Sequence, residues 1–191
     1  MKNMIKLVYV LFLVGSLGCA SNKNLSITAQ DQLNAANVLV SNFLDDPRAT
    51  KVLAGKKKVI GVSKIVNQTT QLVYSNILTD NVIQALRESG ICDATATFNY
   101  NEVENDPLVL KLRKLRTSEE VDQSTVAQKN SLKAPDMTLT GTITEDTVRN
   151  GRKVEKAIVT NLKVVDVSTG LIIWSGQHPI FKTGKRGART W

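Results

Sequence analysis

Side chains that commonly carry out chemistry are scarce in this chain, which has two cysteines, Cys19 and Cys92, and a single histidine, His178. One histidine cannot form the histidine cluster of a zinc site. A histidine directly before a proline favours a surface residue over a general base. The sequence contains no nucleophile elbow and no phosphate-binding glycine loop. We therefore expect a protein that is not an enzyme and that uses no catalytic residue, cofactor or metal.

Cys19 follows a short apolar stretch near the N-terminus. Lys2 and Lys6 precede this stretch, which covers residues 7–17 and is interrupted only by a glycine and a serine. A transmembrane helix needs about twenty apolar residues, so the stretch is too short to span a bilayer. Its length and flanking charge match the hydrophobic region of a secretory signal peptide. We expect residues 1–18 to form such a signal peptide.

The segment Ser16-Leu17-Gly18-Cys19 resembles the processing box of bacterial lipoproteins. Gly18 and Cys19 fit this box, whereas Ser16 and Leu17 depart from its preferred order. The resemblance implies that Cys19 is the lipid attachment residue, because its thiol can take a diacylglyceryl group and its amine, once freed by cleavage, a further acyl chain. Several acyl chains make a stable membrane anchor. The alternative is a cleaved signal peptide in which Cys19 takes no part.

Lipidation of Cys19 would have two consequences. In the best-known sorting system an aspartate after the cysteine retains a lipoprotein in the inner membrane, so Ala20 implies the outer membrane, with the domain facing the periplasm. Cys92 would be the only other cysteine of the mature chain. We expect it to be a buried free thiol, because a lone cysteine usually behaves as a small apolar residue.

The chain is basic, with a formal net charge of +8. Its Lys and Arg residues gather in three clusters, at residues 56–58, 111–116 and 182–189. Such clusters first suggest nucleic acid, but export to the periplasm argues against that partner. The alternatives are anionic lipid headgroups, cell-wall polymer, an acidic protein face or a merely solvated surface.

The first half of the chain predicts alternating helices and strands. Thr28 with Asp31 is a helix-start signal, the pattern places Leu33 on the apolar face of that helix, and Pro47 prevents its continuation. The other elements predicted before residue 135 are a strand over residues 59–66, a helix that ends near residue 89, a short strand over 95–98, a helix opened by Pro107 and a further helix over 119–130.

The last third predicts antiparallel strands. Apolar residues alternate with threonines from residue 137 onward, and Asn150-Gly151 is a strong hairpin signal. If these two residues form the loop, Leu139 lies opposite Leu162 and the apolar side chains of both strands share one face. A second turn over residues 166–170 leads into a third strand, in which Trp174 would lie opposite Lys163. Trp174 would then occupy the other face, and we expect helices to cover both faces and bury it.

These elements predict an α/β fold, with a mixed β-sheet flanked by helices and a C-terminal antiparallel three-stranded meander. We expect one folded domain over residues 28–182. The preceding residues 19–27 would be the lipidated cysteine and a short tether, and residues 183–191 a basic C-terminal tail.

Three segments, residues 62–71, 133–143 and 162–176, resemble the LpoB-type penicillin-binding-protein activator lipoproteins. The most specific piece is the Thr-Gly-x-x-x-Trp-Ser-Gly pattern that ends at Gly176, although CsgG-type secretion lipoproteins share a looser form of it. The resemblance spans roughly residues 55–182. It implies a non-catalytic periplasmic domain that binds and activates a bifunctional peptidoglycan synthase, a class A penicillin-binding protein. The surface that would contact this partner is unknown at this stage.

The tether departs from the family pattern. The best-known relatives carry a long proline-rich tether after the lipid, whereas residues 20–27 are short and polar. An alternative is therefore an interaction or assembly lipoprotein of the same fold that serves another envelope protein, in a machine such as a secretion or flagellar structure. In both cases the membrane is reached through the lipid anchor.

Overall fold

The computed structural model describes residues 25–95 and 107–185 of the chain. Within them, no helix is long and apolar enough to cross a membrane. The elements in chain order are α1 (Ala29–Asp45), α2 (Pro47–Leu53), β1 (Lys58–Val62), β2 (Val66–Asn67), α3 (Ser75–Glu88), β3 (Cys92–Thr95), α4 (Pro107–Lys114), the 3-10 turn η1 (Leu115–Thr117), β4 (Met137–Asn150), β5 (Lys153–Asp166) and β6 (Ile172–Lys185).

The strands form one mixed sheet in the order β3-β1-β4-β5-β6, and the short β2 also pairs with β4. β1 runs parallel to both β3 and β4. β4, β5 and β6 follow one another as long antiparallel neighbours. The predicted mixed sheet with a C-terminal three-stranded meander is therefore confirmed.

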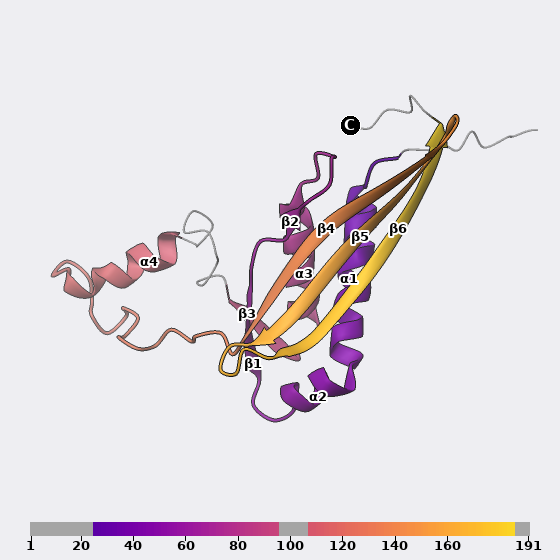
Figure 1. The fold of residues 1–191 in the computed structure, drawn as a ribbon. Helices are drawn as coiled ribbons and strands as arrows, with labels where there is room; N and C mark the ends of the chain where they lie inside the picture. The colour runs from indigo at the N-terminus through magenta and orange to yellow at the C-terminus, as the bar shows by residue number, and fades with distance from the viewer. Residues whose placement is uncertain (1–24, 96–106, 186–191) are drawn as a thin grey trace, which may run out of the picture.

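Helices cover one face of this sheet. α1 packs against α3 and β6, and Figure 1 shows both helices on the same side of the strands. No helix among the described residues lies over the other face, which we call the open face. The expectation of helices on both faces is wrong because residues 119–130 form turns and not a helix, while α4 stands away from the sheet (Figure 1).

The start of α1 follows the sequence signal closely. The Thr28 hydroxyl accepts a hydrogen bond from the Asp31 amide at 3.1 Å, and the Asp31 carboxylate accepts one from the Thr28 amide at 2.8 Å. This reciprocal capping box satisfies two amides that a helix start leaves unpaired. Leu33, however, is 36% exposed. The buried stripe of α1 consists of Gln32, Ala35, Ala36, Leu39, Val40 and Phe43.

The parallel half of the sheet differs in detail from the prediction. The single strand expected over residues 59–66 is instead two strands, β1 and β2. The chain between them leaves the strand path, and its residue Ile65 is buried in the core. The helix expected to end near residue 89 is α3, and Gly90 after it has a φ of 67°, which suits a helix C-terminus. The strand expected at 95–98 begins earlier, as β3, and its last three predicted residues lie outside the described residues.

The β4–β5 hairpin forms, but not in the predicted register. Leu139 lies opposite Val164, and Gly141 lies opposite Leu162. The turn is Gly151-Arg152, with a positive φ of 57° at Gly151 only, so the glycine takes the first turn position as in type II′ turns. This moves each pairing by two residues. Because side chains alternate with a period of two, the apolar residues still share one face.

Trp174 is buried, as predicted, but for a different reason. A β-bulge between β5 and β6 places Trp174 opposite Val164 and moves Ser175 to the predicted place of Trp174, opposite Lys163. An extra residue in one strand reverses the faces of the residues that follow. Trp174 therefore points toward α1 and is 7% exposed. Its ring centroid lies 5.6 Å from that of Phe43.

Gly176 leaves room for this tryptophan. A Cβ atom at Gly176 would lie 2.3 Å from the Trp174 ring and 3.2 Å from Leu39 of α1. The indole ring thus lies over the bare backbone two residues further along the same strand. The Trp-Ser-Gly pattern in the sequence is explained by this contact.

We predict that Gly176→Ala destabilises the protein by about 1–3 kcal/mol, the usual cost of overpacking a core. Urea unfolding measures the change. Ser175→Ala is the matched control because Ser175 is exposed on the open face, and it should stay within about 0.5 kcal/mol of the wild type. Equal stability of the two variants would show that the Trp174 ring can move aside without cost.

Cys92 begins β3 and is 1% exposed, in agreement with the expectation of a buried residue. Its thiol has no disulfide partner among the described residues. Burial, together with the neighbouring Asp93 carboxylate, raises the pKa of this thiol to about 11. A thiol in this state carries little thiolate near neutral pH and reacts slowly.

Candidate functional site

The described residues offer binding surfaces and no metal centre, since no group of three or more metal-ligating side chains occurs among them. Cys19, the predicted lipid attachment residue, lies outside the described residues. His178 lies half-buried on β6, opposite Thr160. The candidate sites are therefore the open face, the projection that carries α4, and the polar cluster that joins the sheet to the N-terminal segment.

The open face carries a hollow of about 760 Å³. Its walls come from β4, β5, β6 and the chain between β1 and β2. The lining residues are Ser63, Lys64, Val66, Thr140, Gly141, Thr142, Asn161, Leu162, Lys163, Ser175, Gly176 and Gln177. Hydroxyl, amide and ammonium groups dominate this set and no carboxylate belongs to it, so the hollow suits a polar or anionic surface of a partner.

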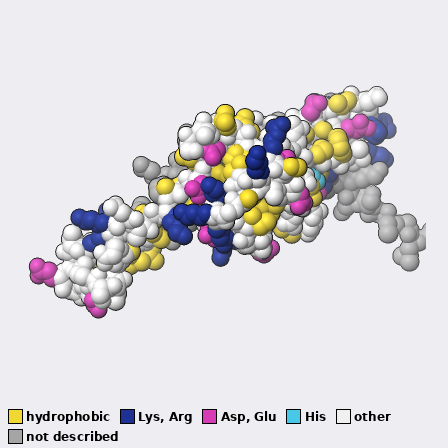
Figure 2. Space-filling model, turned by 90° about the horizontal axis from the view of Figure 1, so that it is seen from below, with side chains coloured by type: hydrophobic (Ala, Val, Ile, Leu, Met, Phe, Trp, Pro, Cys, Tyr) yellow, Lys and Arg dark blue, Asp and Glu magenta, His cyan; other side chains and the backbone are white. Residues whose placement is uncertain are grey.

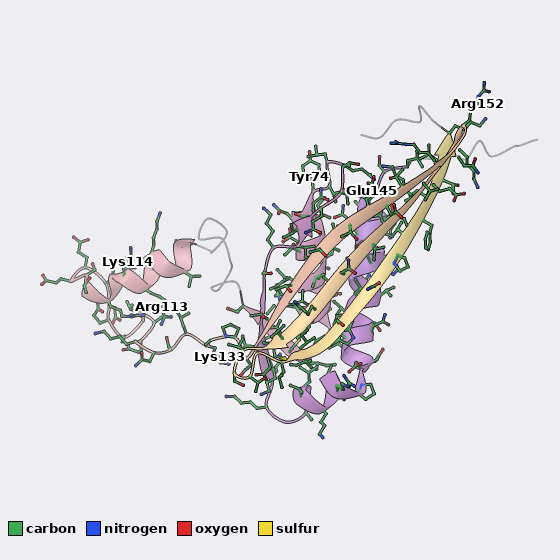
Figure 3. The ribbon with its side chains drawn as sticks, viewed as in Figure 1. Tyr74, Arg113, Lys114, Lys133, Glu145 and Arg152 are labelled. Carbon is green, nitrogen blue, oxygen red and sulfur yellow. The ribbon has the colours of Figure 1, made fainter. Side chains whose placement is uncertain are left out.

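Large apolar side chains are exposed at more than one place on the domain. Phe181 on β6 is 74% exposed, and its neighbour across the strands is Ala157. Leu72 and Tyr74, in the segment between β2 and α3, are 75% and 66% exposed, and Figure 3 shows Tyr74 at the outside of the domain. Aromatic side chains are enriched in protein-binding surfaces, so these exposed rings are candidate contact residues.

A buried ion pair underlies the β4–β5 strands on the covered face. The Lys156 ammonium lies 2.8 Å from the Glu145 carboxylate, and their side chains are only 8% and 5% exposed. Glu145 also accepts hydrogen bonds from Thr70, Gln71 and Thr147. Both charges are thus taken out of water and matched by polar partners.

Burial alone would raise the pKa of Glu145, but the hydrogen bonds from Lys156, Gln71 and Thr70 outweigh it. The pKa of this carboxyl therefore lies below its ordinary value of 4.5. A pKa that is lower in the folded state than in the unfolded state adds stability above the ordinary value. That contribution is lost as the pH falls through the lowered pKa.

The same cluster holds the N-terminal segment against the sheet. The Gln71 side chain donates to Glu145 at 2.6 Å and accepts from the Ile27 amide at 3.1 Å. Leu25 is 3% exposed although the sequence placed it in the tether. In addition, the Lys182 ammonium of β6 lies 2.6 Å from the Asp31 carboxylate at the start of α1.

α4 belongs to a projection that we call the arm, residues 107–134, which extends away from the sheet (Figures 1 and 2). Its own side chains hold it together: Arg113 donates to the Gln128 carbonyl and to Ser131, and Arg116 donates to the Ala127 carbonyl. Leu108 and Leu112 are at least half exposed. The predicted basic cluster at residues 111–116 lies on this arm.

The two other basic clusters have partners in part. Lys57 pairs with Asp93 at 2.7 Å beside β1. Lys182 pairs with Asp31, whereas Lys185 at the end of β6 is exposed. The rest of that cluster lies outside the described residues.

Comparison with models of protein families identifies the family to which the chain belongs. The family model described as peptidoglycan-synthase activator LpoB matches residues 31–180, which extend from α1 into β6. The chain therefore belongs to the LpoB family. The family is one of activators and not of catalysts, in agreement with the expectation that this protein is not an enzyme. A comparison with curated proteins gives no match.

Solved structures also resemble this one. The LpoB C-terminal domain from Salmonella enterica aligns with a TM-score of 0.45 and 20% identity over 78% of this chain and 98% of its own. The domain from Escherichia coli gives 0.45 and 18% over the same shares. Lipoprotein GNA1162 from Neisseria meningitidis gives 0.39 and 15% over 68% of this chain and 85% of its own.

The sequence interpretation missed the Glu145–Lys156 pair and its link to the N-terminal segment. A signal was present, because both residues take inward places in the alternating patterns that include Ile143 and Ile158. Charges of opposite sign at apolar-facing positions of adjacent strands indicate a buried pair. The link through Gln71 carried no such signal, because it joins segments 44 residues apart.

We predict that Lys156→Met destabilises the fold by about 3–5 kcal/mol, because it leaves the Glu145 carboxylate buried without its cation. The double variant Glu145→Gln with Lys156→Met should recover most of that loss. Urea unfolding of the single and double variants measures both effects.

Lys153→Met serves as the control for this prediction, since Lys153 also lies on β5 but pairs with Glu155 of the same strand at the surface. Exposed pairs contribute about 0–1 kcal/mol. A double variant no more stable than Lys156→Met would contradict the role given to the uncompensated charge.

Proposed function

We propose that this chain is an outer-membrane lipoprotein, anchored through Cys19, whose periplasmic domain binds and activates a bifunctional peptidoglycan synthase, a class A penicillin-binding protein. The observation that carries this proposal is the family match over residues 31–180. The processing box at Cys19 and the apolar stretch before it support the anchor. The scarcity of chemically active side chains supports a role through binding.

Activation by a binding domain needs no chemistry of its own. A ligand that binds the active conformation of an enzyme more tightly than the inactive one shifts the population toward activity. The open face is the surface that we assign to this contact. Its hollow presents hydroxyl, amide and ammonium groups, and Phe181, further along β6, is an exposed aromatic side chain.

The first test is stimulation of a purified class A synthase from the native source. We predict that the wild-type chain raises the rate of glycan polymerisation and that Asn161→Arg in the hollow abolishes the increase by filling the contact surface. Thermal unfolding should be unchanged, because Asn161 is half-exposed on the open face. Synthase assays with labelled lipid-linked precursor measure the effect.

Gln84→Arg is the matched control, an exposed side chain on α3 that lies on the other side of the molecule. It should stimulate the synthase as the wild type does. If both variants stimulate fully, the open face is not the contact surface. If the wild-type chain neither binds nor stimulates any class A synthase, the activator proposal fails.

One observation favours a second candidate, an assembly lipoprotein that works close to the outer membrane. Leu25 and Ser26 are buried against the domain, so fewer residues separate Cys19 from the folded domain than the sequence suggested. Since α1 is docked, it adds no reach beyond the sheet. The reach of the domain is therefore that of the sheet, whose long strands each have 14 residues and span about 48 Å at roughly 3.4 Å per residue.

A flexible linker inserted after Ala20 distinguishes these two functions. We predict that insertion preserves or improves function in cells, because a longer tether brings the domain closer to a synthase in the inner membrane. Growth of a strain that depends on this protein provides the measurement, with lipidation and abundance checked by labelled palmitate and immunoblotting. Loss of function at normal lipidation and abundance would instead favour assembly at the outer membrane.

A further inference from the structure

The chain enters the folded domain beside the turn that joins β4 to β5. A Cβ atom at Gly184 would lie 2.9 Å from the Leu25 side chain, so Leu25 packs directly on Gly184. Gly184 lies opposite Val154, the second residue of β5. Figure 1 shows the three long strands meeting at this end, which extends beyond α1. We call it the hairpin tip, residues 149–155 and 183–185.

The hairpin tip is strongly basic. Four cationic side chains, all exposed, belong to it: Arg149, Arg152, Lys153 and Lys185. Glu155 is its only carboxylate and pairs with Lys153. Three cations are thus left without an ion-pair partner among the described residues, and Figure 3 shows Arg152 at the extreme end of the strands.

The connection to Cys19 and the cations without an ion-pair partner among the described residues therefore lie at the same end of the domain. Leu25 is six residues after Cys19, and six residues span at most about 21 Å. A lipid on Cys19 would hold the hairpin tip within that distance of the membrane. A tether of this length also gives the tip a high effective concentration at the membrane surface.

We propose that the hairpin tip binds the anionic phospholipid headgroups of the membrane that holds Cys19, so that the domain stands on this tip with its long axis away from the bilayer. The guanidinium groups of Arg149 and Arg152 suit phosphate oxygens, which they can bind with paired hydrogen bonds. This inference rests on the lipid attachment under the proposed function. An acidic protein face is the competing ligand, and the lipid is favoured because the tether brings it within reach.

Such an orientation fixes which parts of the molecule face the periplasm. α2 and the β5–β6 turn lie at the end of the sheet opposite the tip, and the arm extends from the same end (Figure 1). The open face would then stand upright and remain free along its whole length. A lipid contact at the tip therefore leaves the proposed synthase contact unobstructed.

The first experiment measures binding of the mature chain, with Cys19→Ser to remove the anchor, to vesicles that contain phosphatidylglycerol. Cosedimentation gives the partition coefficient. We expect binding to these vesicles at low salt and none to pure phosphatidylcholine vesicles. Replacing Arg149, Arg152 and Lys185 together by glutamine should weaken binding by roughly 100-fold, or about fivefold for each cation near an anionic surface.

The control carries the same change of net charge on the arm, with glutamine in place of Lys111, Lys114 and Lys129, which are all exposed. This control should bind the vesicles as strongly as the mature chain that carries only Cys19→Ser. Circular dichroism melts verify that both triple variants remain folded. Equal binding by the two triple variants, or an equal loss in both, would overturn the proposal, because either result removes any special role of the tip.

The second experiment measures orientation with the lipidated protein in phosphatidylglycerol vesicles. Single cysteines replace Val148 near the tip or Val167 at the far end, two valines that are 57% and 53% exposed. Buried Cys92 should stay unlabelled because its pKa is raised to about 11. Energy transfer to a headgroup dye should be strong from position 148 and weak from position 167. Equal transfer from both positions would overturn the upright orientation.

These experiments separate the tip from the anchor. If the wild type takes up no labelled palmitate, the lipid attachment fails, while the vesicle measurement still decides whether the tip binds headgroups. If palmitate is taken up and both triple variants bind alike, the anchor stands and the tip proposal fails.

Discussion

The contact between β6 and α1 depends on the absence of a side chain at Gly176. The Trp174 ring lies across this glycine and contacts Phe43 of α1, and Leu39 of α1 also approaches the glycine. Without that space the ring could not lie flat against the strand, and α1 could not approach the sheet. Because α1 also carries the Asp31 that pairs with Lys182, the same close approach sets where the N-terminal connection enters the domain.

The fold class could be predicted because it rests on periodicity, which tolerates local errors. The predicted loop was one residue too early, so the predicted pairing of the hairpin differs from the observed pairing by two positions. Leu139 and Leu162 are nevertheless on the covered face, as predicted, because side chains alternate with a period of two. Helix signals that combine a cap with a spaced apolar stripe, as at Thr28 and Asp31, were equally reliable. Such signals are local, and the sequence contains them in full.

Features that depend on tertiary contacts could not be predicted in the same way. The bulge that turns Trp174 inward adds one residue to a strand, and no residue pattern in the sequence marked it. The helix expected over residues 119–130 does not form, and helical spacing alone rarely stabilises a segment that has no apolar surface to pack on. In the structure, Val126 is the one residue of that segment that is buried.

The candidate sites were also only partly accessible from the sequence. Basic clusters were evident as groups of residues, but three of the four exposed tip cations, Arg149, Arg152 and Lys153, belonged to none of the clusters named from the sequence. They meet Lys185 only because β4, β5 and β6 end together. Surface charge that converges from separate strands is a property of the register and not of any one segment.

A single-layered cover of helices has a consequence for an activator. One face of the sheet is committed to the core, so α1 and the Glu145 cluster can fix the N-terminal segment rigidly to it through Leu25, Ile27 and Asp31. The open face takes no part in that packing, because its hydroxyl and amide side chains are half-exposed and contribute little to the core. Substitutions on the open face should therefore have a small cost in stability. Under the proposed function, the covered face would hold the segment that leads to the anchor, and the open face of the same strands would be left for recognition.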